Sequence, residues 1–362
     1  MPLPTFDPAD YDQQLADKVA RYKADFAAVG LPEPEVFESE RSAYRMRAEF
    51  RMWHVGEEVH YAMFDPADRK TPVMIDVFPP AAEPIARVMS SLRACLNANE
   101  TMRHRLFQTE FLATLSGEVM VALVYHRKLD DAWEVEARAL SADLGAVVIG
   151  RSRKQKIVLE RDWLQERFEL DGRELSYQQV EGSFTQPNGE VNRHMLRWAR
   201  RQVAGVGGDL LELYCGNGNF TIALAPLFDK VLATEMSKTS VYSAQTNLQA
   251  NGIENVAMVR MASEEISDAL AGGREYRRMK DVDLASYNFT TLFVDPPRAG
   301  LDEATVTLAG RFDHILYISC NPETLRANLD VLTRKHRVAS AAAFDQFPYT
   351  HHLECGVFLV RR

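Results

Sequence analysis

Cysteine is scarce in this chain, and its few positions form no metal-binding pattern. The 362 residues include four cysteines, Cys95, Cys215, Cys320 and Cys355, and none shows the C-x-x-C spacing of a zinc or iron–sulfur site. Such scattered positions do not favour a disulfide framework either. We therefore expect no metal, no iron–sulfur cluster and a reducing, cytoplasmic setting.

Long apolar runs and an excess of positive charge are also lacking. No apolar run approaches the ~18 residues that a membrane span requires, and residues 1–7 have neither the basic nor the apolar region of a signal peptide. Lys and Arg number 42 against 51 Asp and Glu, a net charge of −9. We expect no membrane segment, and a polyanion must bind to a local patch rather than to the whole surface.

What the chain does contain is the composition of a folded protein with about two domains. Hydrophobic residues make up 46% and charged residues 26%. Residues 8–29 predict a helix, and the stretch up to residue 180 mixes short strands with helices, which is typical of an α+β domain. Over 181–362, short apolar runs alternate with helical patterns, which predicts an α/β, doubly wound, mainly parallel sheet.

A glycine-containing loop in the second half predicts a nucleoside site. Gly216, Asn219 and their neighbours follow an apolar strand and open a helix, so the backbone can approach a ligand closely. Glu235 ends the next strand, where a carboxylate can accept hydrogen bonds from ribose hydroxyls. No third glycine follows, which favours an adenosine without a pyrophosphate. The G-x-G element alone is a weak signal and also fits a tight turn.

Asp295 lies at the end of another predicted strand. It is followed by Pro296 and Pro297, which fix the backbone at the edge where open α/β sheets bind ligands. A rigid turn would explain one proline but hardly both. Together with the glycine loop, this element resembles an S-adenosylmethionine-dependent methyltransferase domain with a Rossmann-like fold.

Two groups with catalytic potential follow. Cys320 ends a strand on the same predicted edge, and Glu354 begins the last strand. A cysteine is usually a small apolar residue, and a lone glutamate is usually solvated. Yet a thiolate that adds to C6 of uracil makes C5 nucleophilic, and a base can then remove the C5 proton and release the sulfur. How the thiol loses its proton is not visible in the sequence.

The arrangement resembles the RNA uracil-5-methyltransferase family over nearly the whole chain. The matching segments are 44–54, 183–188, 212–220, 294–302, 319–322 and 351–356. The resemblance implies that Cys320 is the nucleophile, that Glu354 is the base, and that S-adenosylmethionine is the cofactor. It implies that the cofactor is held by Gln186, Tyr214, Asn219, Glu235 and Asp295. From the residues alone, Gln186 and Tyr214 fit a structural role equally well.

The resemblance also implies the RNA substrate. Relatives that modify ribosomal RNA typically carry an N-terminal β-barrel and a four-cysteine iron–sulfur cluster, whereas no cysteine precedes Cys95 here. We therefore expect the branch that acts on the T-loop uridine in the T-arm of tRNA, with transfer-messenger RNA as a further substrate. Ribosomal RNA stays the alternative. We expect the chain to act as a monomer.

The candidate RNA contacts lie mainly in the first half. Arg45, Arg47 and Arg51 alternate along one predicted strand and present a basic face, although such a face can also be merely solvated. Phe107 is a candidate to fill the space that a flipped base leaves, and Arg298 is placed to reach the flipped base or its phosphate.

Two other functions compete with this interpretation. Asp-Pro-Pro also occurs in amino-group methyltransferases, but those sites usually end in an aromatic residue where this chain has Arg298, and Cys320 would have no role there. The other is an RNA-folding chaperone with a vestigial cofactor fold. Both reacting groups argue against folding as the sole activity, although folding can accompany catalysis.

Overall fold

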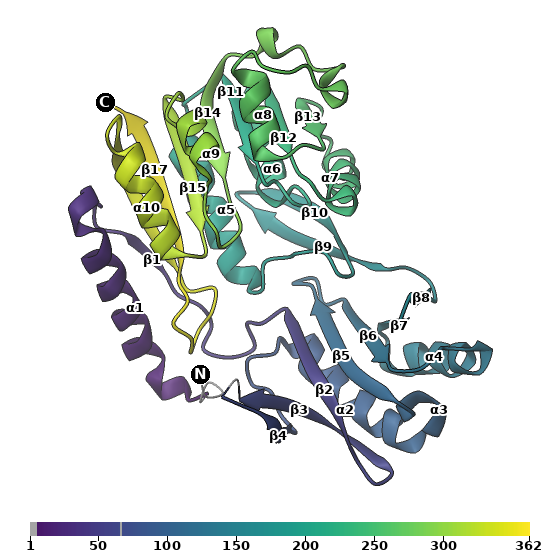
Figure 1. Cartoon of the computed structure of the whole chain (residues 1–362). Helices are drawn as coiled ribbons and strands as arrows, with labels where there is room; N and C mark the ends of the chain where they lie inside the picture. The colour runs from purple at the N-terminus through teal and green to yellow at the C-terminus, as the bar shows by residue number, and fades with distance from the viewer. Residues whose placement is uncertain (1–5, 66) are drawn as a thin grey trace. The chain divides into compact units, whose positions relative to one another are not determined.

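The computed structural model describes residues 6–65 and 67–362, which form two compact units (Figure 1). Unit 1 contains residues 40–167 and 179–189 with the start of the chain, and unit 2 contains residues 11–39, 168–178 and 190–362. The expected boundary at residue 180 assigned residues 11–39 to the first domain, whereas they cluster with the second half of the chain.

Unit 1 is built on a seven-stranded sheet in the order β4-β3-β2-β5-β6-β7-β8. Its strands are β2 (Arg47–Val55), β3 (Glu58–Asp65), β4 (Asp68–Ile75), β5 (Leu106–Ala113), β6 (Val119–Tyr125), β7 (Val147–Ser152) and β8 (Gln155–Val158). Its helices are α2 (Glu83–Ala98), α3 (Glu100–Arg103) and α4 (Asp131–Leu144). Neighbouring strands are antiparallel except β6 and β7, which are joined through α4 and are parallel.

The core of unit 1 follows the alternation seen in the sequence. Phe50 and Met52 of β2 are buried with Leu92 of α2 and Trp133 of α4, while Arg51 on the opposite face of β2 is exposed. A strand that alternates apolar and polar residues buries one face and leaves the other to solvent. The α+β character expected for this half is confirmed.

Unit 2 is built on an eight-stranded sheet in the order β1-β16-β17-β15-β14-β11-β12-β13. Its strands are β1 (Glu35–Phe37), β11 (Asp209–Leu213), β12 (Val231–Thr234), β13 (Val256–Val259), β14 (Phe289–Val294), β15 (His314–Ser319), β16 (His336–Phe344) and β17 (Glu354–Arg361). β17 is antiparallel to both of its neighbours, and the other neighbouring pairs are parallel.

Helices cover both faces of this sheet, as expected for a doubly wound fold. They are α1 (Tyr11–Phe26), α5 (Gly189–Val203), α6 (Asn219–Leu224), α7 (Lys238–Ala250), α8 (Ser263–Leu270), α9 (Glu303–Ala309) and α10 (Pro322–Leu332). α8, α9 and α10 lie in front of the sheet in Figure 1, and α5 and α6 lie behind it. Tyr22 and Phe26 of α1 join the buried core of the sheet, so the N-terminal helix is an integral part of unit 2.

The strands β9 (Trp163–Leu170) and β10 (Arg173–Val180) pair with each other as a two-stranded sheet. Each contains a point at which the chain changes from one unit to the other. In unit 2, the strand order reverses between β11 and β14, because β12 and β13 continue on one side and β15 continues on the other. Open α/β sheets bind ligands beyond the carboxyl ends of the strands at such a reversal.

Candidate active site

Four of the expected site residues directly follow parallel strands of unit 2. Tyr214 follows β11, Glu235 follows β12, Asp295 follows β14, and Cys320 follows β15. Parallel neighbours end at the same edge of a sheet, so these residues lie along one edge. The sequence therefore placed them correctly relative to their strands.

Glu354 reaches this edge because its strand runs the other way. β17 is antiparallel to β15, with Ser319 opposite Cys355. Continued by one residue, this register sets Cys320 opposite Glu354. Cys320 is partly exposed, whereas Glu354 is buried. The sheet thus brings a thiol and a carboxyl group from distant parts of the sequence side by side.

The loops that carry Asp295 and Cys320 are fastened to each other. Asn321 donates its side-chain amide to the carbonyl oxygen of Arg298 at 2.9 Å and caps the start of α10 through its side-chain oxygen. Gly300 has φ +74°, and a Cβ there would meet Thr324 of α10 at 2.8 Å. Only glycine fits this close approach without displacing the helix.

Burial dominates the electrostatics of the reacting groups. It raises the pKa of Cys320 to about 11, with the negative charges of Glu354 and Asp295 adding to the effect and Arg298 opposing it. Burial also raises the pKa of Glu354 well above its usual range, again with Asp295 adding and Arg298 opposing. The pKa of Asp295 is raised by burial as well. Each of these groups is therefore more readily neutral than it would be in water.

The glycine loop has open space beside it, which fits a bound nucleoside. Gly216 has φ +56°, and a Cβ there would meet no described atom within 4 Å. Its N–H donates to one carboxylate oxygen of Glu235 at 3.1 Å, and Ser237 N–H donates to the other at 2.7 Å. Glu235 stays partly exposed, and each of its oxygens retains a lone pair for a ribose hydroxyl.

Tyr214 takes an unusual backbone conformation at the same loop. Its φ is +60°, in the left-handed region that non-glycine residues rarely adopt. Its hydroxyl donates to Ser263 at 2.8 Å, and burial raises the pKa of that hydroxyl. Backbone strain of this kind persists where the surroundings over-determine it, often at ligand sites.

Asn219 is less available than the sequence suggested. Its side chain exchanges two hydrogen bonds with the side chain of Asn192 at 3.0 and 2.9 Å, and its carbonyl oxygen accepts from Tyr177. Asn247, which is buried, donates to the carbonyl oxygen of Asn217 at 2.9 Å. Asn192 and Asn247 thus hold the glycine loop, and sequence reasoning missed both because a polar residue on a helix carries no local sign of burial.

Glu212 is a further acidic residue that the sequence analysis did not single out. It lies within β11, has no exposed surface, and neither carboxylate oxygen has a hydrogen-bond partner within the described part of the chain. Burial raises its pKa to about 8. Thr221 opposes this rise in pKa, although its buried hydroxyl also has no hydrogen-bond partner within the described part of the chain. A glutamate inside the apolar run 210–213 is the signal that could have identified it.

The three arginines of the expected RNA face differ in their surroundings within unit 1. Arg47 is partly buried and donates to the carbonyl oxygen of Ser183 at 2.6 Å and to the Thr185 hydroxyl at 3.3 Å. Burial lowers the pKa of both Arg45 and Arg47. Only Arg51 is exposed, so the three do not form a uniform phosphate-binding face.

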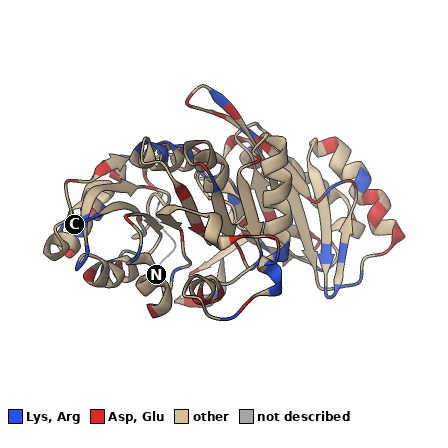
Figure 2. Cartoon of the chain, turned by 90° about the horizontal axis from the view of Figure 1, so that it is seen from above, with Lys and Arg blue, Asp and Glu red and all other residues tan. Residues whose placement is uncertain are grey.

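Arg51 instead belongs to a stack of flat side chains. Its guanidinium lies 3.7 Å from the ring centre of Phe107, and that ring stacks on His126 with centres 3.9 Å apart. Figure 2 marks the basic residues in blue and the acidic residues in red, and both kinds occur throughout the described chain.

Gln186 also belongs to unit 1, in the loop Ser183–Asn188. Arg47 contacts this loop, and Met46 N–H donates to the carbonyl oxygen of Pro187 at 2.8 Å. The loop is therefore fastened to the start of β2.

Among residues 6–65 and 67–362, no group of three or more His, Cys, Asp or Glu side chains is arranged to hold a metal ion. Over the same residues, no helix has both the length and the apolar character to cross a membrane.

Comparison with known proteins identifies close relatives. The family model for tRNA (uracil-5-)-methyltransferase matches residues 10–362. A tRNA/tmRNA (uracil-C(5))-methyltransferase of Azoarcus sp. (strain BH72) is 69% identical over 99% of this chain and 99% of that protein. A protein of the same name from Aromatoleum aromaticum is 66% identical over 100% of this chain and 98% of that protein.

A solved structure shares the fold. The crystal structure of Pyrococcus abyssi tRNA (uracil-54, C5)-methyltransferase in complex with S-adenosyl-L-homocysteine has a TM-score of 0.73. It is 22% identical, and the match covers 97% of this chain and 83% of that one. The expected α/β methyltransferase fold is thereby confirmed.

The raised pKa of Cys320 leads to a test by alkylation. Because the resting pKa is about 11, we expect the rate of iodoacetamide modification at Cys320 to rise about tenfold per pH unit from roughly pH 7 to 9.5, without a plateau. Glu354→Gln removes a negative neighbour, lowers the thiol pKa and so speeds modification at any fixed pH in this range. Peptide mass spectrometry measures both rates, with Cys95 in the other unit as the control whose rate the substitution leaves unchanged. A plateau below about pH 9 would contradict the raised pKa.

Proposed function

Because the chain belongs to the tRNA (uracil-5-)-methyltransferase family, we propose that it transfers a methyl group from S-adenosylmethionine to C5 of the T-loop uridine of tRNA. The observation that carries the proposal is the register of β15 and β17, which, continued by one residue, sets Cys320 opposite Glu354, with Asp295 adding to the raised pKa of both. The names of the relatives favour transfer-messenger RNA as a second substrate. The monomeric state and the cytoplasmic location stay predictions.

S-adenosylmethionine, when bound, supplies an electrophilic methyl group. Glu235 and Asp295 are the acidic residues available to orient it, Gly216 leaves the space, and Tyr214 and Asn219 shape the loop around it. Gln186 is proposed as a further cofactor contact on the strength of the family resemblance alone.

Cys320 opens the reaction by attacking C6 of the flipped uracil. A bond forms between Sγ and C6, and the electrons of the C5–C6 double bond move onto C5 and the O4 enolate. C5 then has the electron density to take the methyl group. Without the thiol, C5 of uracil is too weak a nucleophile.

Glu354 completes the reaction as the base. Its carboxylate takes the proton from C5, the electrons of the C5–H bond restore the C5–C6 double bond, and Sγ of Cys320 leaves C6. The raised pKa makes Glu354 a stronger base than an exposed carboxylate would be.

Activation of the thiol is left to the moment of attack. At a pKa of about 11, Cys320 is protonated in the resting protein, so its proton passes to solvent water at the partly exposed thiol as the Sγ–C6 bond forms. Arg298 is the cation that lowers the thiol pKa, and we assign it this electrostatic role in addition to a contact with the flipped base or its phosphate. An amino-group methyltransferase would need neither Cys320 nor Arg298 for its reaction.

A covalent trap tests the proposal. tRNA containing 5-fluorouridine cannot lose a proton from C5, so incubation with S-adenosylmethionine is expected to leave a stable protein–RNA complex on a denaturing gel. Cys320→Ala should form no complex, while Cys355→Ala serves as a control that still forms it. In a separate assay, we expect radiolabelled methyl groups to be transferred to tRNA but not to a ribosomal RNA fragment of equal length. If the Cys320→Ala variant still forms the covalent complex, Cys320 is not the nucleophile.

The two different arginine environments of β2 give a test of the RNA face. Arg51→Ala should weaken tRNA binding and reduce the slope of log K against log salt by about 1, because one phosphate contact is lost. Arg47→Ala removes an equal charge from the same strand but from a side chain held by Ser183 and Thr185, so we expect the salt slope to stay unchanged. Filter binding over a salt series measures both, and equal slopes for the two variants would contradict the assignment.

A further inference from the structure

One face of α1 is directed at the loop that precedes Glu354. Tyr11, Gln14, Lys18 and Arg21 recur at spacings of three and four, which places them on one side of the helix. Each of them contacts the segment 345–353 between β16 and β17, more than 300 residues away in sequence.

A buried ion pair forms the centre of this contact. The Lys18 ammonium donates to Asp345 at 2.7 Å and to the carbonyl oxygen of Phe347 at 2.9 Å. The two charged side chains are only 3% and 0% exposed. Gln14 donates to the second carboxylate oxygen of Asp345 at 3.2 Å. Buried charges tolerate few arrangements, so this pair fixes the start of the loop against the helix.

The middle of the loop is held in the same way. Tyr349 has φ +61°, a left-handed conformation that a non-glycine residue keeps only under constraint. Its N–H donates to Gln14 at 3.3 Å, and its ring meets Tyr11 edge-on with centres 6.0 Å apart. Arg21 then donates to the carbonyl oxygen of His351 at 2.8 Å. The helix thus binds alternate residues of the loop, up to three residues before Glu354.

We propose that α1 positions Glu354 for removal of the C5 proton, with Lys18 and Arg21 as positioning residues that act through the loop 345–353. This inference rests on the proposed role of Glu354 as the base. Proton transfer requires the carboxylate to lie within hydrogen-bonding reach of the C5 hydrogen, and a displacement of about 1 Å can cost as much as 100-fold in rate. Glu354 directly follows this loop, whereas Cys320 follows β15 in another part of the chain, so we expect attack by Cys320 to be unaffected.

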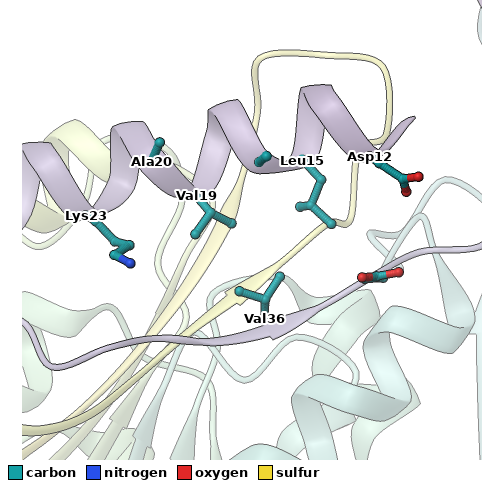
Figure 3. A pocket seen from close by; sticks show the side chains of 8 residues that line it. Asp12, Leu15, Val19, Ala20, Lys23 and Val36 are labelled. Atoms are coloured by element: carbon teal, nitrogen blue, oxygen red, sulfur yellow. The ribbon is translucent and has the colours of Figure 1, made fainter. Parts of the chain in front are cut away.

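The other side of α1 supplies a matched control. There Leu15 and Val19 face Val36 of β1 across an open groove of about 670 Å³, with Lys23 at one end (Figure 3). Lys23 pairs with Glu33 at 2.7 Å, and both side chains are largely exposed. Lys23→Ala therefore removes a cation from the same helix without touching the loop.

The experiment separates methyl transfer from proton removal. tRNA labelled with tritium at uridine C5 is incubated with methyl-¹⁴C S-adenosylmethionine in single-turnover conditions, and the two labels are followed separately. In the parent protein we expect tritium release to keep pace with methyl transfer. Arg21→Ala is expected to slow tritium release roughly 10- to 100-fold relative to methyl transfer, so that methylated covalent adduct accumulates on ordinary tRNA.

Lys18→Met combined with Asp345→Asn removes the ion pair without leaving a buried charge unpaired, and should show the same separation. Lys23→Ala should keep the two labels together. Trapping on 5-fluorouridine tRNA should keep its parental rate in all variants. A variant that is merely less folded lowers both labels in equal proportion, and that outcome for Arg21→Ala and for the double variant would overturn the inference.

Glu354→Gln distinguishes this failure from failure of the proposed function. It should accumulate adduct more strongly than any α1 variant. If Glu354→Gln releases tritium at the parental rate, the base itself is misassigned. If Glu354→Gln accumulates adduct and the α1 variants do not, only the positioning role is wrong.

Discussion

The antiparallel pairing of β17 with β15 is the constraint on which the site depends. In a purely parallel sheet, only the carboxyl ends of strands meet at the ligand-binding edge. Here one strand enters from the opposite direction, so its first residue, Glu354, lies opposite Cys320 at the end of β15. Backbone hydrogen bonds of the sheet fix the register of the two strands, and the contacts of α1 with the loop 345–353 are proposed to set the Glu354 side chain within that frame. Both parts lose their conformational freedom on folding rather than at each encounter with substrate.

Burial at this edge disfavours the charged forms of the reacting groups. Cys320, Glu354 and Asp295 all become negative on ionisation; Glu354 and Asp295 add to the raised pKa of Cys320, and Asp295 adds to that of Glu354. Within the described part of the chain, the positive charge of Arg298 opposes the raised pKa of both Cys320 and Glu354. Raised pKa values of this kind concentrate at functional sites. Burying polar groups there lowers the stability of the fold but gives the groups the pKa values that the reaction needs. A thiol that stays protonated at rest is also less open to oxidation than a preformed thiolate.

The sequence predicted the residues at the strand ends because strand ends are local features. An apolar run followed by Asp-Pro-Pro or Ser-Cys-Asn-Pro marks both the strand and its edge, and the parallel order of the sheet then brings these ends together. Lys18 shows the limit of this reasoning. Its partner Asp345 lies 327 positions away, and a lysine in an amphipathic helix looks solvated. The three-residue strand β1, which follows Pro32 and Pro34, was missed for a similar reason, because β16 is its only strand partner within the described residues.

Periodicity also assigns a face without saying what covers it. The alternation along β2 correctly separates its arginines from the buried Ala48, Phe50 and Met52, yet it gave Arg47 and Arg51 the same role. In the structure, Arg47 holds the loop that carries Gln186, and Arg51 stacks on Phe107. One strand therefore contributes to two different tasks along its length. Its first residue fixes the loop proposed to contact the cofactor, and a residue four positions later faces the solvent where RNA is proposed to bind. The residues that pack against each side chain of such a face come from segments distant in sequence, so they can be identified only in the folded chain.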